Sequence, residues 1–255
     1  MTKISKAIII AAGRGNRFSI TDDMPKCLLE IGGKTILQRT LEVLRENEIY
    51  DISVVRGYKK QLINYPEIKY YENTDYLNNN ILRSLFFAEK EMDAGFVFSY
   101  SDIIYQKNIV EKLLQKSSDI DLVVDRDWLK QYINRKKHPV TEAELVKVEN
   151  GKITRIGKDI VMPEEAQGEF IGLAKFSKKG AEILKKEYQK LVERYRDRKD
   201  QRFQNAAFFE KAYLTDMIQY LIDQGYPIDS VDIKGGWAEI DTDEDFERAK
   251  KQWSS

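Results

Sequence analysis

A small-residue segment near the N-terminus carries groups that can bind phosphate. Residues 7–10 are apolar and typical of a buried strand, and they lead into a loop with two glycines: Ala11, Ala12, Gly13, Arg14, Gly15, Asn16 and Arg17. Glycine lets the backbone approach a ligand closely, and converging backbone N–H groups hold phosphate oxygens. The Arg17 guanidinium would add a permanent positive charge. The loop lacks the third glycine of a dinucleotide fingerprint and the GK[ST] of a P-loop, so by itself it could equally be a tight turn.

Two more charged residues could face this loop. Lys26 follows Pro25 and precedes an apolar pair, and Asp102 comes directly after an apolar run at 96–100. Ligands of open parallel sheets bind beyond the carboxyl ends of the strands. Because the glycine loop and Asp102 both follow predicted strands, we expect them to face one crevice.

Apolar strands alternate with amphipathic helices through the first half of the chain. We predict strands at 7–10, 52–55, 68–71, 96–100 and 121–124, and helices at 35–47, 81–92 and 107–115. This alternation is typical of a parallel sheet with helices on both faces. We therefore predict an α/β fold, Rossmann-like and doubly wound, with a mostly parallel sheet.

The second half of the chain departs from this alternation. A hairpin over 143–156, with Asn150-Gly151 at its turn, and a strand at 168–176 indicate a small antiparallel lid over 125–176, which would set acceptor specificity. We predict helix over 178–224, interrupted near 197–202, with a buried face that includes Phe208 and Phe209. A strand at 228–233 and a C-terminal helix at 244–253 complete one domain spanning 1–255.

Composition excludes several classes of protein. Lys plus Arg equals Asp plus Glu at 42 each, so no overall field attracts nucleic acid or a membrane surface. The single cysteine, Cys27, rules out an internal disulfide and fits a reducing compartment. The apolar run at 7–10 is too short for a signal peptide or a membrane span. We expect a cytoplasmic protein with no nucleic-acid or membrane partner.

Several motifs together resemble those of sugar-phosphate-type nucleotidyltransferases. They are AAGRGNR after the first strand, MPKCLL shortly behind it, and an aspartate after the 96–100 strand. Within that superfamily, YLNNNILRSL, FSYSDIIY and GWAEIDTDEDFERAK look most like phosphonate and choline-phosphate cytidylyltransferases, over essentially the whole chain. The resemblance implies a Mg²⁺-dependent reaction with CTP. An anionic acceptor oxygen attacks the α-phosphorus and pyrophosphate leaves, so catalysis is positional and electrostatic.

The resemblance also implies roles for individual residues. Ala11, Ala12, Gly13 and Gly15 would bind the triphosphate through backbone N–H groups, with Arg17 and Lys26 on its oxygens, Asp102 and Asp241 on Mg²⁺, and Asn80 and Ser84 on the cytosine or ribose. Taken alone, Lys26 could be a solvated lysine and Asp241 a helix cap. Asn80 could likewise cap a helix, and Ser84 could be a packed serine.

The acceptor site is expected within the lid. Its candidates are Arg126, Asp127, Trp128, His138, Glu142 and Glu169, with Arg135, Lys137 and Glu144 nearby. An arginine could hold a phosphonate dianion, and a carboxylate or an aromatic face could hold an ammonium group. Trp128 and Trp237 could instead be packing residues, and His138, the single histidine, could be a structural hydrogen-bonding group.

The acceptor itself is expected to be small. Many relatives have two acids where this chain has only Asp102, in SYSD, which leaves the metal geometry open. That single acid and the stretch RKKHPVTEAELV favour a small phosphonate, such as 2-aminoethylphosphonate or 2-hydroxyethylphosphonate, over phosphocholine, another phosphorylated metabolite or a sugar phosphate. A non-catalytic nucleotide sensor would lack Lys26, Asp102 or Asp241, and all three are present. The chain could also form a homodimer.

Overall fold

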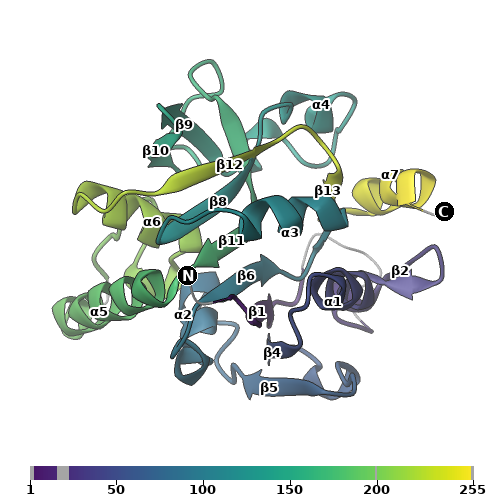
Figure 1. Cartoon of the computed structure of the whole chain (residues 1–255), viewed down its shortest axis with the longest axis horizontal. Helices are drawn as coiled ribbons and strands as arrows, with labels where there is room; N and C mark the ends of the chain where they lie inside the picture. The colour runs from purple at the N-terminus through teal and green to yellow at the C-terminus, as the bar shows by residue number, and fades with distance from the viewer. Residues whose placement is uncertain (1–2, 16–22, 199, 254–255) are drawn as a thin grey trace.

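One mixed sheet organises the residues that the structure describes, which are 3–15, 23–198 and 200–253 of this computed structural model (Figure 1). Its strand order is β5-β4-β1-β6-β11-β8-β12-β10-β9. In chain order the strands are β1 (Lys6–Ala11), β4 (Asp51–Arg56), β5 (Ile68–Glu72), β6 (Phe96–Tyr100), β8 (Ile120–Asp125), β9 (Leu145–Glu149), β10 (Lys152–Ile156), β11 (Gly168–Phe176) and β12 (Asp229–Ile233). Strands β5, β4, β1 and β6 are parallel to one another, as are β8 and β12.

Helices cover both faces of the sheet. Strand β1 shows why, because successive side chains point to opposite sides: Ile8 packs in one core and Ile9 in the other. The first core is covered by α2 (Ile81–Phe86), α5 (Lys178–Tyr195) and α6 (Leu214–Asp223), and the second by α1 (Ile36–Glu46) and α3 (Lys107–Leu114). Figure 1 shows these two groups on opposite sides of the strands. The predicted α/β fold is confirmed.

Two short strand pairs and two further helices lie around the sheet. Strand β2 (Glu30–Ile31) pairs with β3 (Lys34–Thr35), and β7 (Ile103–Tyr105) pairs with β13 (Trp237–Glu239). Helix α7 (Asp243–Trp253) packs beside β2, and the short α4 (Leu129–Tyr132) follows β8. The β7–β13 pair brings the C-terminal part of the chain next to the end of β6.

Strand β11 lies in the centre of the sheet. The predicted strand at 168–176 is present, but it runs antiparallel between β6 and β8 and every one of its residues is buried. It therefore belongs to the core and not to a lid, because both of its edges are paired. The predicted hairpin is β9–β10, and it extends the sheet at the edge beside β12.

Two predicted helices are shorter than their apolar pattern indicated. Helix α2 ends at Phe86, because the chain then turns so that Glu91 accepts hydrogen bonds from Lys69 and Tyr71 of β5. Helix α5 ends at Tyr195 and α6 begins at Leu214, and Phe208 and Phe209 lie in the connection between them. Helix α6 starts at Leu214 because the Asp216 carboxylate accepts a hydrogen bond from the Tyr213 amide, 2.8 Å away.

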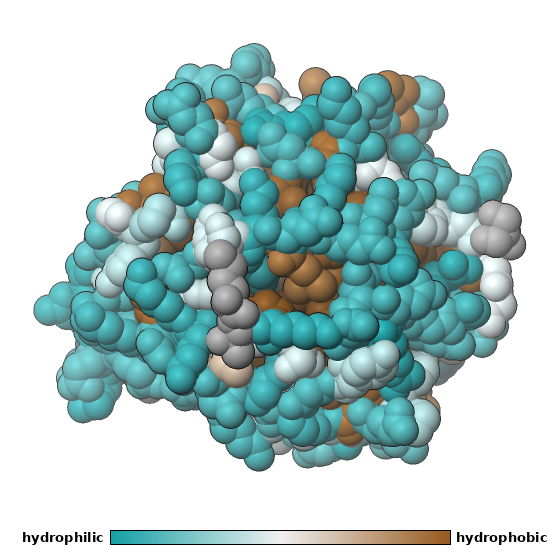
Figure 2. All heavy atoms as spheres, in the orientation of Figure 1, coloured by the Kyte–Doolittle hydropathy of each residue, from teal (hydrophilic) through white to brown (hydrophobic). Residues whose placement is uncertain are grey.

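The surface is mostly hydrophilic on the face shown in Figure 2. This agrees with a chain in which a third of the residues are charged. Among the described residues, none of the helices combines the length and the apolar character needed to cross a membrane.

Gly172 permits the close contact between β11 and β6. It has a φ of +82°, and a Cβ atom at this position would lie 2.3 Å from Cδ2 of Tyr100. The left-handed backbone coincides with a register shift between β11 and β8, between Phe170 and Ala174. Only glycine adopts this conformation without strain and leaves room for the Tyr100 ring.

We expect Gly172→Ala to lower the free energy of unfolding by about 2–4 kcal/mol, because backbone strain and a clash with Tyr100 act together. Gly225→Ala is the matched control. Gly225 has a φ of +84°, but beyond its chain neighbours no atom of the described residues lies within 4 Å of its added Cβ, so only the strain of about 1–2 kcal/mol remains. Urea denaturation measures both variants, and equal losses would show that the Tyr100 contact contributes nothing.

Candidate active site

Two cavities meet at Lys26. The first, of about 200 Å³, is lined by the glycine loop and by the start of α2, and we call it the loop cavity. The second, of about 170 Å³, extends toward β11 and β13, and we call it the inner cavity. Both are lined by Lys26, Ile81, Tyr100 and Asp102. Two ligands bound side by side would therefore meet at these residues.

Three distant segments bring Lys26, Asp102 and Asp241 together. Lys26 begins a 3₁₀ turn (Lys26–Leu28) after Pro25, Asp102 follows β6, and Asp241 follows β13. The Ile240 amide donates a hydrogen bond to the Asp102 carbonyl over 2.9 Å. This backbone bond continues the β7–β13 pairing and fixes the two aspartates next to each other.

Lys26 forms ion pairs with both aspartates. Its Nζ atom lies 2.7 Å from Oδ2 of Asp102 and also contacts Oδ1 of Asp241. Burial by itself would lower the pKa of Lys26, but the two carboxylates outweigh this effect and raise the pKa well above its ordinary value. Lys26 is therefore a permanent cation at the junction of the cavities.

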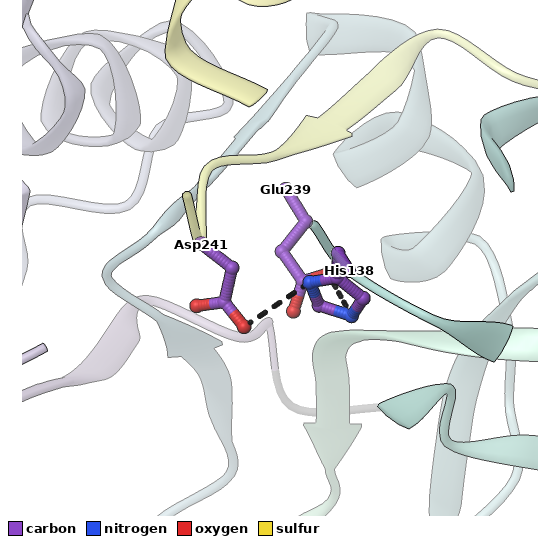
Figure 3. Close-up of side chains that lie close together, drawn as sticks. All are labelled: His138, Glu239 and Asp241. Carbon is purple, nitrogen blue, oxygen red and sulfur yellow. Dashed lines mark ion pairs between the residues drawn. The ribbon is translucent and has the colours of Figure 1, made fainter. Parts of the chain in front are cut away.

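A second layer of charged groups surrounds Asp241. His138 lies between Glu239 and Asp241, with its Nε2 and Nδ1 atoms each 3.5 Å from a carboxylate oxygen (Figure 3). The buried Arg135 guanidinium pairs with Glu239 at 3.2 Å and with Asp245 at 2.6 Å. Burial, followed by the charge of Asp241, raises the pKa of Glu239 well above its usual range, although Arg135 opposes this shift.

Asp245 fixes the backbone at Asp241. Its Oδ2 atom accepts hydrogen bonds from the amides of Asp241 at 3.1 Å and of Thr242 at 2.9 Å. Arg135 pairs with Asp245 and neutralises its negative charge. Asp245 can therefore stay buried while it binds the backbone amides of the loop before α7. The Asp241 carboxylate is consequently left directed toward Lys26.

Carboxylate oxygens at the junction have the chemistry of a divalent-cation site. Asp102 and Asp241 supply the hard oxygen ligands that Mg²⁺ takes in proteins, usually one or two at a time. His138, Glu239 and Asp241 also place one ligand atom each within 4.8 Å of one another. His138 of this second group lines neither cavity, whereas Asp102 and Asp241 both line the inner cavity, where the phosphates would lie. The pair Asp102 and Asp241 therefore fits a metal better.

The predicted nucleotide-binding residues line the loop cavity, namely Ala11, Ala12, Gly13, Gly15, Lys26, Asn80, Ser84 and Asp102. Asn80 also caps α2, because its Oδ1 atom accepts a hydrogen bond from the Ile81 amide at 2.9 Å. Ser84 Oγ lies 2.9 Å from Nδ2 of Asn73. Arg17, predicted to bind the triphosphate, lies outside the described residues.

Three predicted acceptor-binding residues line neither cavity. Arg126 pairs with Asp232 at 3.0 Å, Asp127 pairs with Lys130 at 2.6 Å, and Trp128 is buried in a small apolar cluster. The cause is backbone pairing after β8, where the Arg126 amide donates to the Ile233 carbonyl and holds this turn against β12. The structure corrects our expectation that these residues form the acceptor site.

Of the remaining acceptor candidates, one lines a cavity and two are buried away from both cavities. Glu142 lines the inner cavity, whereas His138 is buried behind Asp241. Glu169 is buried outside both cavities, where its Oε1 atom accepts a hydrogen bond from the Tyr132 hydroxyl at 2.6 Å. Burial raises the pKa of Glu169 to about 8.

Sequence reasoning assigned no role to two charged residues that line the inner cavity, Glu239 and Lys158. Glu239 could have been found, because residues two apart on a strand share a face and Asp241 follows it at that spacing. Lys158 lies after β10 in a stretch with no recognisable motif. Only the folded chain shows that it approaches the site.

The fold and the site define a nucleotidyltransferase. The chain belongs to the MobA-like NTP transferase domain family, which matches residues 7–225. A relative from Campylobacter jejuni named CTP:phosphoglutamine cytidylyltransferase is 34% identical over 253 residues, 94% of this chain and 97% of the relative. A 2-aminoethylphosphonate cytidylyltransferase from Lancefieldella rimae is 30% identical, over 60% of this chain and 61% of the relative.

A solved structure supports the fold. The inositol-1-phosphate CTP transferase of T. maritima superposes with a TM-score of 0.73 at 20% identity, over 98% of this chain and 96% of that chain. The matched region spans about half the length of two other curated relatives. The predicted resemblance to sugar-phosphate-type nucleotidyltransferases is confirmed.

The raised pKa of Glu169 makes stability depend on pH. The native state keeps a proton that the unfolded chain loses between its ordinary pKa of 4.5 and about 8, so this contribution to stability is present below that window and is lost as the pH rises through it. Glu169→Gln removes the ionisation. We expect the variant to gain roughly 2–4 kcal/mol relative to the wild type between pH 5 and pH 9.

Urea denaturation at the two pH values measures this difference. Glu149→Gln is the control, because Glu149 is exposed at the end of β9, and it should show the same pH dependence as the wild type. A Glu169→Gln curve parallel to that of the wild type would show that Glu169 is ionised throughout.

Proposed function

We propose that this protein transfers CMP from CTP to a phosphate or phosphonate oxygen of a small acceptor and releases pyrophosphate. The observation that carries the proposal is the meeting of two cavities at Lys26 and Asp102, with Asp241 in contact with Lys26. One cavity is lined by the glycine loop, and the other has room for a second small molecule. The named activities of the relatives support CTP as the nucleotide.

In this proposal the loop cavity binds CTP. Backbone N–H groups of Ala12, Gly13 and Gly15 bind the triphosphate, and Asn80 and Ser84 contact the nucleoside. Lys26 lies at the α-phosphate, where its fixed charge stabilises the negative charge that develops as an acceptor oxygen bonds to phosphorus and the bond to pyrophosphate breaks. The acceptor oxygen is already ionised at neutral pH, so no general base is needed.

We infer that Asp102 and Asp241 hold a divalent cation, Mg²⁺. When bound, such an ion neutralises phosphate charge and orients the triphosphate. The two carboxylates contribute the ligands, and Asp245 and Arg135 keep Asp241 in position to do so.

The acceptor is a small phosphonate or phosphate ester. Our sequence-based choices are 2-aminoethylphosphonate and 2-hydroxyethylphosphonate, followed by phosphocholine and sugar phosphates. The match to the phosphoglutamine relative, over nearly the whole of both chains, adds phosphorylated amino-acid derivatives to these candidates. We further propose that 1–255 is one catalytic domain that acts in the cytoplasm, binds no nucleic acid or membrane, and can form a homodimer.

Pyrophosphate release tests the proposal. The protein is incubated with Mg²⁺ and CTP, ATP, UTP or GTP, together with each candidate acceptor. We expect release that requires CTP, Mg²⁺ and one class of acceptor. Equal release with all four nucleotides would contradict the choice of CTP, and failure to bind CTP in equilibrium dialysis would overturn the function.

We expect Lys26→Met, Asp102→Asn and Asp241→Asn each to lower kcat by about 100-fold or more, because each removes a charge that acts on the reacting phosphates. Lys34→Met is the control. Lys34 forms a comparable ion pair with Glu42 at 2.6 Å, but on the surface, so its kcat should match that of the wild type. Circular dichroism verifies folding, and full kcat in any of the three variants would remove that residue from the mechanism.

A further inference from the structure

The inner cavity contains a positive charge that the transfer reaction does not use. Lys26 and Lys158 are the cationic residues that line it in the described part of the chain. Lys26 also lines the loop cavity, but Lys158 does not. An acceptor phosphate must reach the junction at Lys26, because its oxygen attacks the α-phosphorus there. Lys158 is therefore available for a different group of the acceptor.

Lys158 is held as a cation between acidic and aromatic groups. Its Nζ atom lies 3.0 Å from Oε2 of Glu142 and 4.8 Å from the ring centroid of Tyr213. Burial would lower the pKa of Lys158, but Glu144, Tyr213 and Glu142 outweigh burial and raise it. A bound acceptor consequently meets a fixed positive charge beside a negative one.

Glu144 places a second carboxylate beside this pair. It is buried, and its two oxygens accept hydrogen bonds from the Tyr100 hydroxyl at 3.0 Å and the Thr215 hydroxyl at 2.7 Å. These donors fix the carboxylate in one orientation at the wall of the cavity. Lys158, Glu142 and Glu144 together line the inner cavity with charges of both signs, which are complementary to a ligand that carries both an anion and a cation.

The charges discriminate among the candidate acceptors. A quaternary ammonium group binds aromatic faces, but Lys158 already lies over Tyr213 and would repel it. An acceptor with an amine alone, such as 2-aminoethylphosphonate, would bring no anion of its own to Lys158, which would keep only its pairing with the protein's carboxylates. A cavity of about 170 Å³ is below the usual size of drug-binding pockets and restricts the acceptor to a small molecule.

We propose that the acceptor is a phosphorylated amino acid or its close derivative, whose α-carboxylate pairs with Lys158 and whose α-ammonium group lies against Glu142 and Glu144. This inference rests on the proposed cytidylyl transfer and names the substrate class of the same site. The phosphoryl group lies at Lys26, and the zwitterionic end occupies the inner cavity.

Pairs of acceptors that differ only in the carboxylate test this inference. One pair is O-phospho-L-serine and phosphoethanolamine; the other is L-glutamine phosphorylated on its side-chain amide and the decarboxylated form of that compound. With CTP and Mg²⁺, we expect the carboxylate-bearing member of at least one pair to have a kcat/KM about tenfold or more higher. Phosphocholine and 2-aminoethylphosphonate should react poorly.

Variants of Lys158 connect this preference to the cavity. Lys158→Met should abolish the advantage of the carboxylate-bearing acceptor and leave the KM for CTP within about twofold, because Lys158 lies outside the loop cavity. Lys158→Arg should restore most of the advantage. Lys152→Met is the control, since Lys152 pairs with Asp229 at the surface, and it should behave as the wild type.

The outcomes separate the two proposals. Turnover of phosphoethanolamine or phosphocholine at least as fast as that of the amino acids would overturn the zwitterion proposal and leave cytidylyl transfer in place. The zwitterion proposal would also be overturned, with cytidylyl transfer left in place, if CTP bound but no amino-acid acceptor were turned over. An acceptor preference that Lys158→Met left unchanged would have the same consequence. Absence of CTP binding would overturn both.

Discussion

The geometry of the candidate active site depends on one buried cation that lies between two carboxylates. Lys26 lies 76 residues from Asp102 and 215 residues from Asp241 in the sequence, yet its ammonium group contacts both. Two carboxylates this close repel each other unless a cation compensates them. The Lys26 charge therefore permits the β6 end and the β13 end to approach, and the hydrogen bond from Ile240 to Asp102 then keeps them together.

The acidic residues behind this centre need compensation of their own. Glu239, Asp241 and Asp245 lie within a few residues of one another, and leaving such charges buried without partners is strongly destabilising. Arg135 compensates the negative charge through ion pairs with Glu239 and Asp245, and His138 contacts both Glu239 and Asp241. The segment around 135–138, which we expected at an acceptor, instead supports the Asp241 side of the centre.

The features that local sequence patterns encode could be predicted, namely individual strands and short motifs. The apolar runs located strands such as β1 and β6. The loop and Asp102 could be assigned because they follow strand ends, and Lys26 and Asp241 because they match a family pattern. The position of β11 could not be predicted, since its antiparallel pairing with β6 and β8 depends on strands far away in sequence. Lys158 and the displacement of Arg126 from the site likewise depend on tertiary contacts.

The central position of β11 also bears on how the chain folds while it is being synthesised. Strands β1, β4, β5 and β6 leave the ribosome early and can pair with one another, but β6 and β8 have no common partner until residues 168–176 emerge. Their edges remain open during that interval, and open edges bind other chains. Asp241 emerges later still, so Lys26, Asp102 and Asp241 can come together only after all the strands of the main sheet have been synthesised.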